Sequence, residues 1–395
     1  MSQGVTHVEQ QKCFSRTFIA NSFEALEASN LLDDWDHLAQ AMPTQMPFQS
    51  VHWNRTWWSK FRRRGIFLRD ELNLVCAVRD ERLVGVIPLF ASTFGLPGVP
   101  LFRYLRLLGA DPNLTEWSSV ICLDQDRRAL QAVWLQEAVK SRFEFCFLQI
   151  RGFTAEELKA ARLDTVGFAR VFQPSEHFIL ALPDNWHSFK ASLKRNIKES
   201  LRHCYNSLSR GNLTASLAVI DDAEGLRARI GQFYVWHALR ANNTETVPHP
   251  DYFNRGIYRQ FLDALAVGLC PRGQMKLFEL KLNDRPVAYR LGFINGDTLY
   301  LYYSAFDPAF SKFSVMTTLV AEVIKWAIHE KIGFVNLSFG RDVSKTRWGP
   351  SEVQSYEALI GTKGLWIMRV LRWAVDAARK LATRVKGKYP ILGNM

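Results

Sequence analysis

The stretch 276–348 constrains the fold of this chain more than any other part of the sequence. Two runs of alternating apolar and polar residues, 276–282 and 286–294, are followed by an Asn-Gly-Asp turn at 295–297 and a third run at 298–305. Asn and Gly both tolerate positive φ, so an Asn-Gly turn between such runs is typical of a β-hairpin. The stretch therefore predicts three consecutive antiparallel strands.

The residues that follow predict a helix and one more strand. Apolar residues recur at helical spacing over 314–331, and Ser314 stands where a capping side chain is expected. A short apolar run at 334–339 then ends at Gly340. Three strands, a helix and a strand make a compact mixed α/β unit. Units of this kind bind ligands where strands end and helices begin.

The first half of the chain predicts a weaker version of the same order. Strands are expected at 73–79, 83–90, 103–109, 118–123 and 144–150, with helices at 22–41 and 127–140. Residues 83–102 carry no charge, but Pro and Gly interrupt them. Because Pro costs about 3 kcal/mol in a helix interior, we expect a strand and a buried loop there, and no membrane helix.

Residues 184–209 are predicted to form one long basic helix between the two units. Its positive charges are Lys190, Lys194, Arg195, Lys198, Arg202 and, just beyond, Arg210. Glu199 is the one acid near the middle of the helix. This pattern is typical either of a solvated basic face or of a contact with phosphate or an acidic substrate.

Composition limits the class of protein and the kind of partner. At 395 residues and 48% hydrophobic content, the chain is long enough for two or three domains with sizeable cores. Its net charge of +12 favours an acidic partner, such as the phosphates of acyl-CoA, anionic lipid, nucleic acid or an acidic glycan. The six cysteines have no metal-ligand spacing, so no metal site is expected, and reduced thiols favour a cytoplasmic protein. The motifs GxSxG, GxxxxGK[ST] and GxGxxG do not occur, which disfavours α/β-hydrolases, P-loop NTPases and Rossmann dehydrogenases.

Several motifs together resemble the acyltransferase domain of the CelD/BcsL family. They are AYRLGF and LYLYYSAFDPAFSKFSVMTTLVAEVIKWAIHEKIGFVNLSFGRDVSKTRWG, preceded by FQSVHWNRTWWSKF, RLVGVIPLF, RYLRLLGA and SLKRNIKESLRHCYNSL. That family is GNAT-like, is related to the Fem peptidyltransferases and is associated with cellulose or exopolysaccharide synthesis. The resemblance implies an α/β fold of two GNAT-like mixed-sheet domains in tandem: a degenerate one at 1–175 and an acyltransferase domain at 176–364. This sequence departs from the family pattern twice: Ser314-Val315-Met316 stands at the helix start where Pro-Gly is usual, and Ser344 precedes Lys345 where a Tyr is usual.

The resemblance implies a cosubstrate and a place for it. Acetyl-CoA or another acyl-CoA is the expected cosubstrate, with no permanently bound cofactor. Its pyrophosphate is expected at the helix that begins at Ser314, on the amides of Met316, Thr317 and Thr318. Free N–H groups and the helix dipole make such an end favourable for an anion.

Three side chains are candidates for the chemistry of transfer. Asp342 is expected to act as a general base, and Lys345 to stabilise an oxyanion or bind phosphate. His237 is the alternative base, because its unperturbed pKa of about 6.5 suits the task. The residues expected to contact substrate are Tyr303, Arg240, Arg341, Arg347 and Trp348.

The expected function is transfer of an acyl group to an amine or hydroxyl of an unidentified acceptor, a glycan or its precursor. Two alternatives remain open. One is a Fem-like transfer that depends on aminoacyl-tRNA and uses the basic helix. The other is a non-catalytic scaffold in polysaccharide assembly, which the missing Pro-Gly keeps open.

The C-terminal segment 365–395 predicts a separate element. Residues 365–388 place Trp366, Trp373 and other apolar residues on one stripe of a strongly basic helix. Such a helix suits an anionic membrane surface, and the alternative is that it docks on the N-terminal domain. The first alternative would make a cytoplasmic protein peripheral to the inner membrane.

Overall fold

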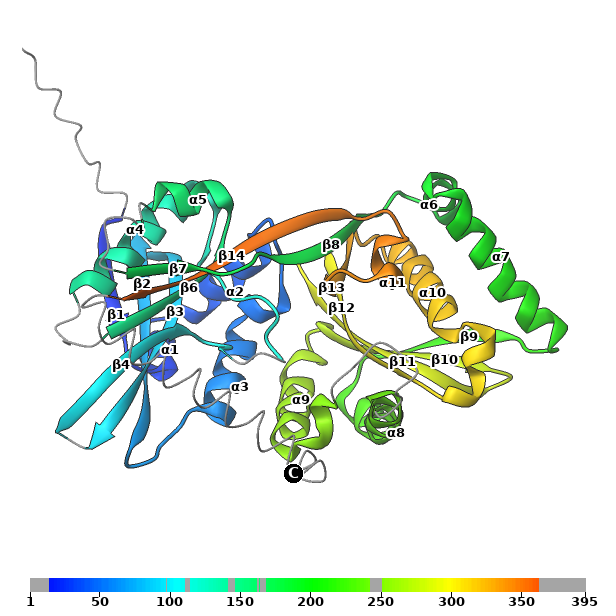
Figure 1. Cartoon of the computed structure of the whole chain (residues 1–395), viewed down its shortest axis with the longest axis horizontal. Helices are drawn as coiled ribbons and strands as arrows, with labels where there is room; N and C mark the ends of the chain where they lie inside the picture. The colour runs from blue at the N-terminus through cyan, green and yellow to red at the C-terminus, as the bar shows by residue number, and fades with distance from the viewer. Residues whose placement is uncertain are drawn as a thin grey trace, which may run out of the picture.

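The computed structural model describes residues 14–96, 98–110, 114–140, 146–161, 163, 168–241 and 251–361. Its 14 described strands form one mixed sheet in the order β1-β2-β3-β4-β6-β14-β8-β13-β12-β11-β10-β9, with β5 and β7 paired beside this path. Helices pack against the sheet in both halves of an elongated molecule (Figure 1). The protein is therefore a mixed α/β fold, as predicted. The expected tail helix at 365–388 lies outside the described residues.

The N half, residues 14–171, holds the first group of elements. They are β1 (Arg16–Ala20), α1 (Phe23–Ala28), α2 (Leu32–Ala41), η1 (Pro47–Gln49), α3 (Val51–Phe61), β2 (Leu68–Arg79), β3 (Arg82–Leu96), β4 (Val99–Leu107), β5 (Ile121–Cys122), α4 (Asp124–Lys140), β6 (Cys146–Phe153), α5 (Ala155–Ala160) and β7 (Phe168–Val171). Strands β2, β3 and β4 are antiparallel neighbours. After the crossover helix α4, β6 returns parallel to β4.

The C half, residues 175–361, holds the second group. They are β8 (Ser175–Ala181), α6 (Trp186–Ser192), α7 (Arg195–Arg210), β9 (Ala215–Ile220), α8 (Ala223–Ala241), η3 (Tyr252–Asn254), α9 (Gly256–Leu269), β10 (Met275–Leu282), β11 (Arg285–Asn295), β12 (Thr298–Phe306), η4 (Pro308–Phe313), α10 (Val315–His329), β13 (Phe334–Phe339), α11 (Val343–Thr346) and β14 (Ser351–Gly361). The predicted order of three antiparallel strands, helix and strand is confirmed in β10, β11, β12, α10 and β13. The two halves therefore repeat one arrangement, a three-stranded meander followed by a crossover helix and a parallel strand.

The last strand joins the two halves. Residues 351–355 of β14 pair with β8, and residues 356–361 pair with β6 and β7. The core also crosses the boundary, because Trp53 of α3 is fully buried. Its ring lies 5.2 Å from that of Phe261 on α9 and 5.5 Å from that of Phe293 on β11. The halves thus share both a sheet and a core.

Four local predictions are wrong. The helix expected at 184–209 is two helices, since Leu193 is buried in an extended conformation between α6 and α7. The helix expected at 22–41 is also two, because the chain turns at Asn30, whose φ is 55°. The buried loop expected before residue 102 is the end of β3 and the start of β4, which Gly98 joins with a φ of 82°. The strand expected at 118–123 is reduced to β5.

No helix in the part of the chain that the structure describes combines the length and the apolar character needed to cross a membrane.

Candidate functional site

The candidate site lies where β12 and β13 separate. The two strands pair in parallel from Thr298 with Phe334 to Tyr300 with Asn336, and no pairs follow in the rest of these two described strands. Beyond that point both strands run toward the start of α10 and the loop before α11. Parallel strands that diverge leave a gap between their carboxyl ends, which is where ligands enter α/β sheets.

The backbone near this gap is irregular on both sides. On one side, the register between β11 and β12 shifts between Arg290 and Gly292, so β12 carries one extra residue. On the other side, Ser338 of β13 has a φ of 69°, which is rare for a residue with a side chain. Bulges and strained residues of this kind gather at functional sites, because they redirect side chains.

A loop of the N half contacts both strands at the gap. The Tyr302 hydroxyl donates a hydrogen bond of 2.6 Å to the carbonyl of Leu114. The Tyr300 hydroxyl and the Phe339 amide both donate to the Glu116 carboxylate, the second at 3.3 Å. Glu116 therefore bridges β12, at the last residue that pairs with β13, and the end of β13, from the opposite half of the molecule.

Basic groups converge on the same place from three elements. Lys345 Nζ donates to the carbonyls of Phe339 and, at 3.2 Å, Gly340. The guanidinium of Arg290 on β11 donates to the Leu301 carbonyl at 3.2 Å. The guanidinium of Arg240 on α8 donates to the Ser304 hydroxyl at 3.3 Å. We call Glu116, Arg240, Arg290, Tyr300 and Lys345 the junction cluster.

Burial shifts the pKa values of the junction cluster away from their usual ranges. It raises the pKa of Glu116, which Tyr300 and Lys345 partly offset. It lowers the pKa of Lys345 to about 8, against the opposite pull of Glu116. It also lowers the pKa of Arg290 to about 10, with Arg240 adding to the effect. Titratable groups with shifted pKa values that lie close together are typical of sites where protons are transferred.

Two of the predicted chemical residues stand beside this cluster. Asp342 caps α11, because its carboxylate accepts from the Ser344 amide at 2.6 Å, and Ser344 lowers the pKa of Asp342. His237 on α8 is fully buried, with Nδ1 3.4 Å from the Ser304 carbonyl oxygen. Its ring lies 5.7 Å from that of Tyr303, another predicted residue.

Three of the residues predicted to contact substrate lie apart from the junction cluster. Arg341 pairs with two carboxylates, one of them Glu176 at 3.0 Å. Arg347 donates to the Ser200 hydroxyl on α7. Trp348 is 3% exposed and belongs to the core of the C half. The structure thus brings Tyr303, Arg240, His237, Asp342 and Lys345 together, and it places the other three next to α11, which carries Lys345, in the sequence.

The predicted phosphate site is the first turn of α10. Ser314 precedes the helix with a φ of 53°, and its side chain makes no capping hydrogen bond, contrary to expectation. The amides of Thr317 and Thr318 donate to the Ser314 carbonyl at 3.0 and 3.2 Å. Among the described residues, the amide of Met316 has no such bond. Within the predicted set, Met316 therefore offers the accessible donor.

Sequence reasoning missed Glu116, Arg290, Tyr300 and His177. His177 on β8 is fully buried with its ring 4.6 Å from that of Trp117, and burial lowers its pKa to about 3. Arg290 was detectable, because it interrupts the apolar run AYRLGF of a strand. Glu116 was not, because only the tertiary structure brings its loop to β12.

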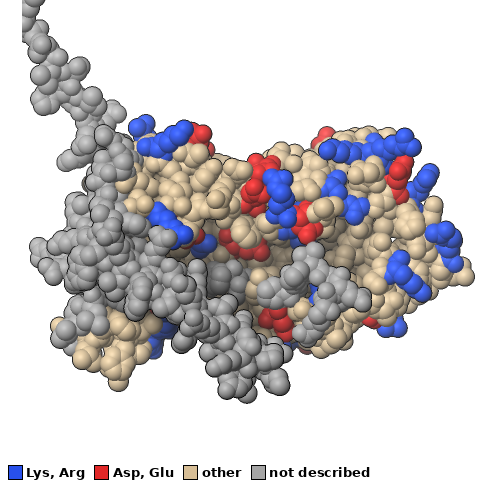
Figure 2. Space-filling view, in the orientation of Figure 1, with Lys and Arg blue, Asp and Glu red and all other residues tan. Residues whose placement is uncertain are grey.

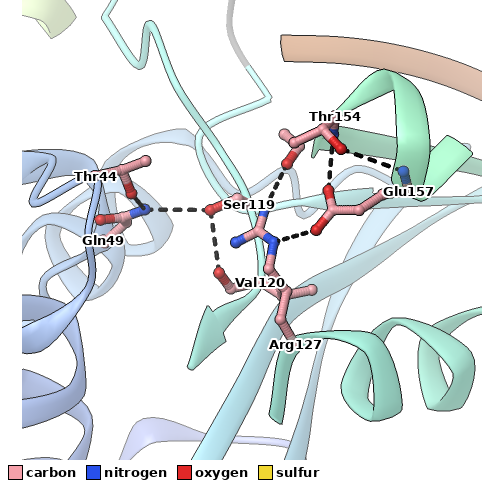
Figure 3. A network of polar contacts seen from close by, with 8 residues as sticks. Thr44, Gln49, Ser119, Val120, Arg127, Thr154 and Glu157 are labelled. Carbon is pink, nitrogen blue, oxygen red and sulfur yellow. Dashed lines mark hydrogen bonds and ion pairs between the residues drawn. The ribbon is translucent and has the colours of Figure 1, made fainter. Parts of the chain in front are cut away.

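The N half contains the counterpart of this gap, and protein groups fill it (Figure 3). Arg127, in the first turn of α4, donates to Glu157 at 2.5 Å and to the Gly152 carbonyl at 2.6 Å. Gly152 has a φ of 74°, and a Cβ there would lie 2.5 Å from Ser119 Cβ. The α4 start also carries Asp126, which pairs with Arg79 at 2.5 Å, and the exposed Asp124, whose charge opposes binding of an anion.

Comparisons with known proteins agree with the architecture. Residues 191–346 match the family model described as an acetyltransferase (GNAT) domain. FemX aligns at a TM-score of 0.55 and 12% identity over 82% of this chain and 95% of that one. A conserved protein of unknown function from Bacteroides thetaiotaomicron aligns at 0.50 and 13% identity over 87% and 100%. Curated protein sequences give no match. The second half of the chain therefore carries a GNAT-type domain, within a fold similar to that of FemX.

Proposed function

We propose that this protein is a GNAT-type acyltransferase that moves an acyl group from acyl-CoA to an amine or hydroxyl. The observation that carries the proposal is the junction cluster. It places a carboxylate of raised pKa beside an ammonium of lowered pKa at the gap between β12 and β13. The match of residues 191–346 to the GNAT domain supports the same class of reaction.

In the proposed binding mode, the phosphates of the donor lie against the first turn of α10. Its pantetheine arm runs between β12 and β13 and brings the thioester to the junction cluster. The amide of Met316 and the helix dipole supply the attraction for phosphate. The acceptor approaches from the side of α8, where Tyr303, His237 and Arg240 lie.

In the proposed reaction, Glu116 is the general base that removes a proton from the acceptor. The acceptor atom then attacks the thioester carbonyl, and Lys345 as an ammonium stabilises the oxyanion. The C–S bond breaks as the carbonyl re-forms, and the CoA thiolate leaves. Asp342 is a weaker base than Glu116, because its pKa is lowered whereas that of Glu116 is raised. Its proposed part is to hold Lys345 and Arg240 by charge, and His237 remains the alternative base.

The acceptor in this proposal is a glycan or a glycan precursor of the cell envelope, reached from the cytoplasmic side of the inner membrane. This part rests on the resemblance to the CelD/BcsL family, with its link to cellulose and exopolysaccharide synthesis. Acetyl-CoA is the proposed donor.

A Fem-like transfer from aminoacyl-tRNA is a second candidate, favoured by one surface. Figure 2 shows Lys and Arg side chains gathered over α6 and α7. The exposed ones are Lys190, Lys194, Arg195, Arg202 and Arg210. Such a face suits a nucleic-acid backbone as well as it suits solvent.

Thermal unfolding with acetyl-CoA, a longer acyl-CoA and bulk aminoacyl-tRNA separates the candidates. A ligand at 100 times its Kd raises the free energy of unfolding by about 2.7 kcal/mol. We expect acetyl-CoA to raise the melting temperature, with CoA lacking its phosphates as the inactive control. A rise with tRNA alone would favour the Fem-like candidate. If neither an acyl-CoA nor tRNA raises the melting temperature, both transferase candidates are contradicted, and the non-catalytic scaffold is left.

A further inference from the structure

The tip of the N-half sheet exposes a compact group of large apolar side chains. They are Ile66 (67% exposed), Phe67 (61%), Leu96 (51%) and Phe94 (38%). Large apolar side chains that gather on the surface usually mark a binding face. Neither the junction cluster nor the proposed transfer uses these residues.

Backbone contacts hold the four residues together. The turn from Arg64 to Arg69 is closed by a bond of 3.0 Å from the Gly65 amide to the Leu68 carbonyl. The Gly95 amide donates to the Phe67 carbonyl at 3.0 Å, which ties this turn to the end of β3. The apolar residues thus sit on one supported tip. Figure 1 shows the end of β3 and the start of β4 at the lower left margin, on the far side of the N half from the C half.

Positive charge surrounds this tip. Residues 62–71 contain four arginines and two acids. Arg62 and Arg64 are exposed. The acid Asp70 is turned inward, with a side chain 1% exposed, and pairs with Arg63 at 3.2 Å. The other acid, Glu71, pairs with Arg103 at 3.2 Å. Glu71 keeps 57% of its side chain exposed but lies farther along β2, so the exposed charges nearest in sequence to Ile66 and Phe67 are those of arginines.

We propose that this tip inserts into the surface of a bilayer that contains anionic phospholipid. Ile66 and Phe67 would enter the interface between headgroups and acyl chains, and Leu96 and Phe94 would follow. Arg62 and Arg64 would lie against the phosphates, where each basic residue adds attraction. A protein partner would not require exposed arginines beside the apolar group, whereas an anionic bilayer presents apolar and negative layers in this order.

Co-sedimentation of the full chain with vesicles tests the proposal. The probes are vesicles of phosphatidylcholine with about 30% phosphatidylglycerol, and vesicles of phosphatidylcholine alone. We expect the protein to pellet with the anionic vesicles, and Ile66→Ser/Phe67→Ser to lower the partition coefficient at least about tenfold. The matched control is Val267→Ser on α9, a residue 57% exposed, which should leave the partitioning unchanged.

Three outcomes would overturn the proposal. The first is a wild-type protein that stays in the supernatant with anionic vesicles. The second is a double variant that pellets as the wild type does, because binding then belongs to another segment, such as residues 362–395. The third is a wild-type dimer that the double variant makes monomeric without vesicles, because the tip then binds a second copy. A Phe67→Trp variant gives a direct readout, since lipids brominated on the acyl chains should quench its added fluorescence.

Discussion

The two halves of this molecule share one arrangement but differ at the gap that each arrangement creates. A glycine of positive φ stands beside the end of each parallel strand: Gly152 in β6 with 74°, and Gly340 after β13 with 89°. A Cβ at Gly152 would lie 2.5 Å from Ser119, whereas one at Gly340 would meet no described atom within 4 Å. The same topology thus produces a gap filled by Arg127 and Glu157 in the N half, and a gap lined by the junction cluster in the C half.

The first turns of the two crossover helices, α4 and α10, also differ in their charge. Helix α4 begins Asp124-Gln125-Asp126, and α10 begins Val315-Met316-Thr317. The exposed Asp124 repels a phosphate and Asp126 is already paired with Arg79, whereas the neutral turn of α10 leaves the helix dipole available. The N half supports the other half instead, because its loop supplies Glu116. Under the proposed function, one fold is used once as structure and once as a site.

The largest expected effect is on kcat, and it distinguishes two carboxylates of the N half, Glu116 and Glu157. Glu116→Gln should lower kcat by about 10²- to 10⁴-fold, the usual contribution of a general base. Its melting temperature should change little, because the amide keeps a hydrogen-bond acceptor for Tyr300. Glu157→Gln, in the filled gap, should leave kcat unchanged. Steady-state kinetics with an acetyl acceptor measures both, and equal losses in the two variants would refute the division of roles.

The next largest expected difference is in the free energy of unfolding, between variants of Gly152 and of Gly340. Gly152→Ala should lower the free energy of unfolding by roughly 2–4 kcal/mol, because a strained φ and a close contact add together. Gly340→Ala should lower it by only roughly 1–2 kcal/mol, the cost of the φ alone. Denaturant unfolding of both variants tests this, and similar losses would mean that the C-half gap is filled as well.

The pH dependence of the rate tests the proposed charge states of Glu116 and Lys345 in the junction cluster. A base must be ionised, so the rate should rise with pH through the raised pKa of Glu116. Lys345 must be protonated to hold an oxyanion, so the rate should fall as pH passes its pKa of about 8. In Lys345→Arg the charge persists, and the fall should move upward by a pH unit or more. If the rate of the Lys345→Arg variant falls at the same pH as that of the wild type, Lys345 is not the group that stabilises the oxyanion.

Local patterns in the sequence were enough for much of the fold. The predicted runs 276–282 and 298–305 became β10 and β12 almost residue for residue, because alternation and an Asn-Gly turn are local signals. The single helix predicted at 184–209 was wrong, because two extended residues, Leu193 and Lys194, separate α6 from α7 while the apolar seam continues. The apolar pattern indicates which residues are buried on both helices, but it does not indicate where one helix ends and the next begins.

The site was only partly predictable for a related reason. Asp342 and Lys345 follow a strand in sequence, so their place at its end could be read directly. Glu116 reaches Tyr300 across 184 positions of the chain, through the packing of one half against the other. Its raised pKa depends on that burial, which no run of neighbouring residues encodes.

The most direct test of the division between the halves is a calorimetric titration with acetyl-CoA. The wild type should bind one molecule per chain. Thr317→Asp gives α10 the acid that α4 has at its third position, and should weaken binding about tenfold by repulsion of the phosphates. The matched variant Gln125→Asp, at the exposed start of α4, should bind as the wild type does. Two molecules per chain, or weakening by Gln125→Asp and not by Thr317→Asp, would contradict the account.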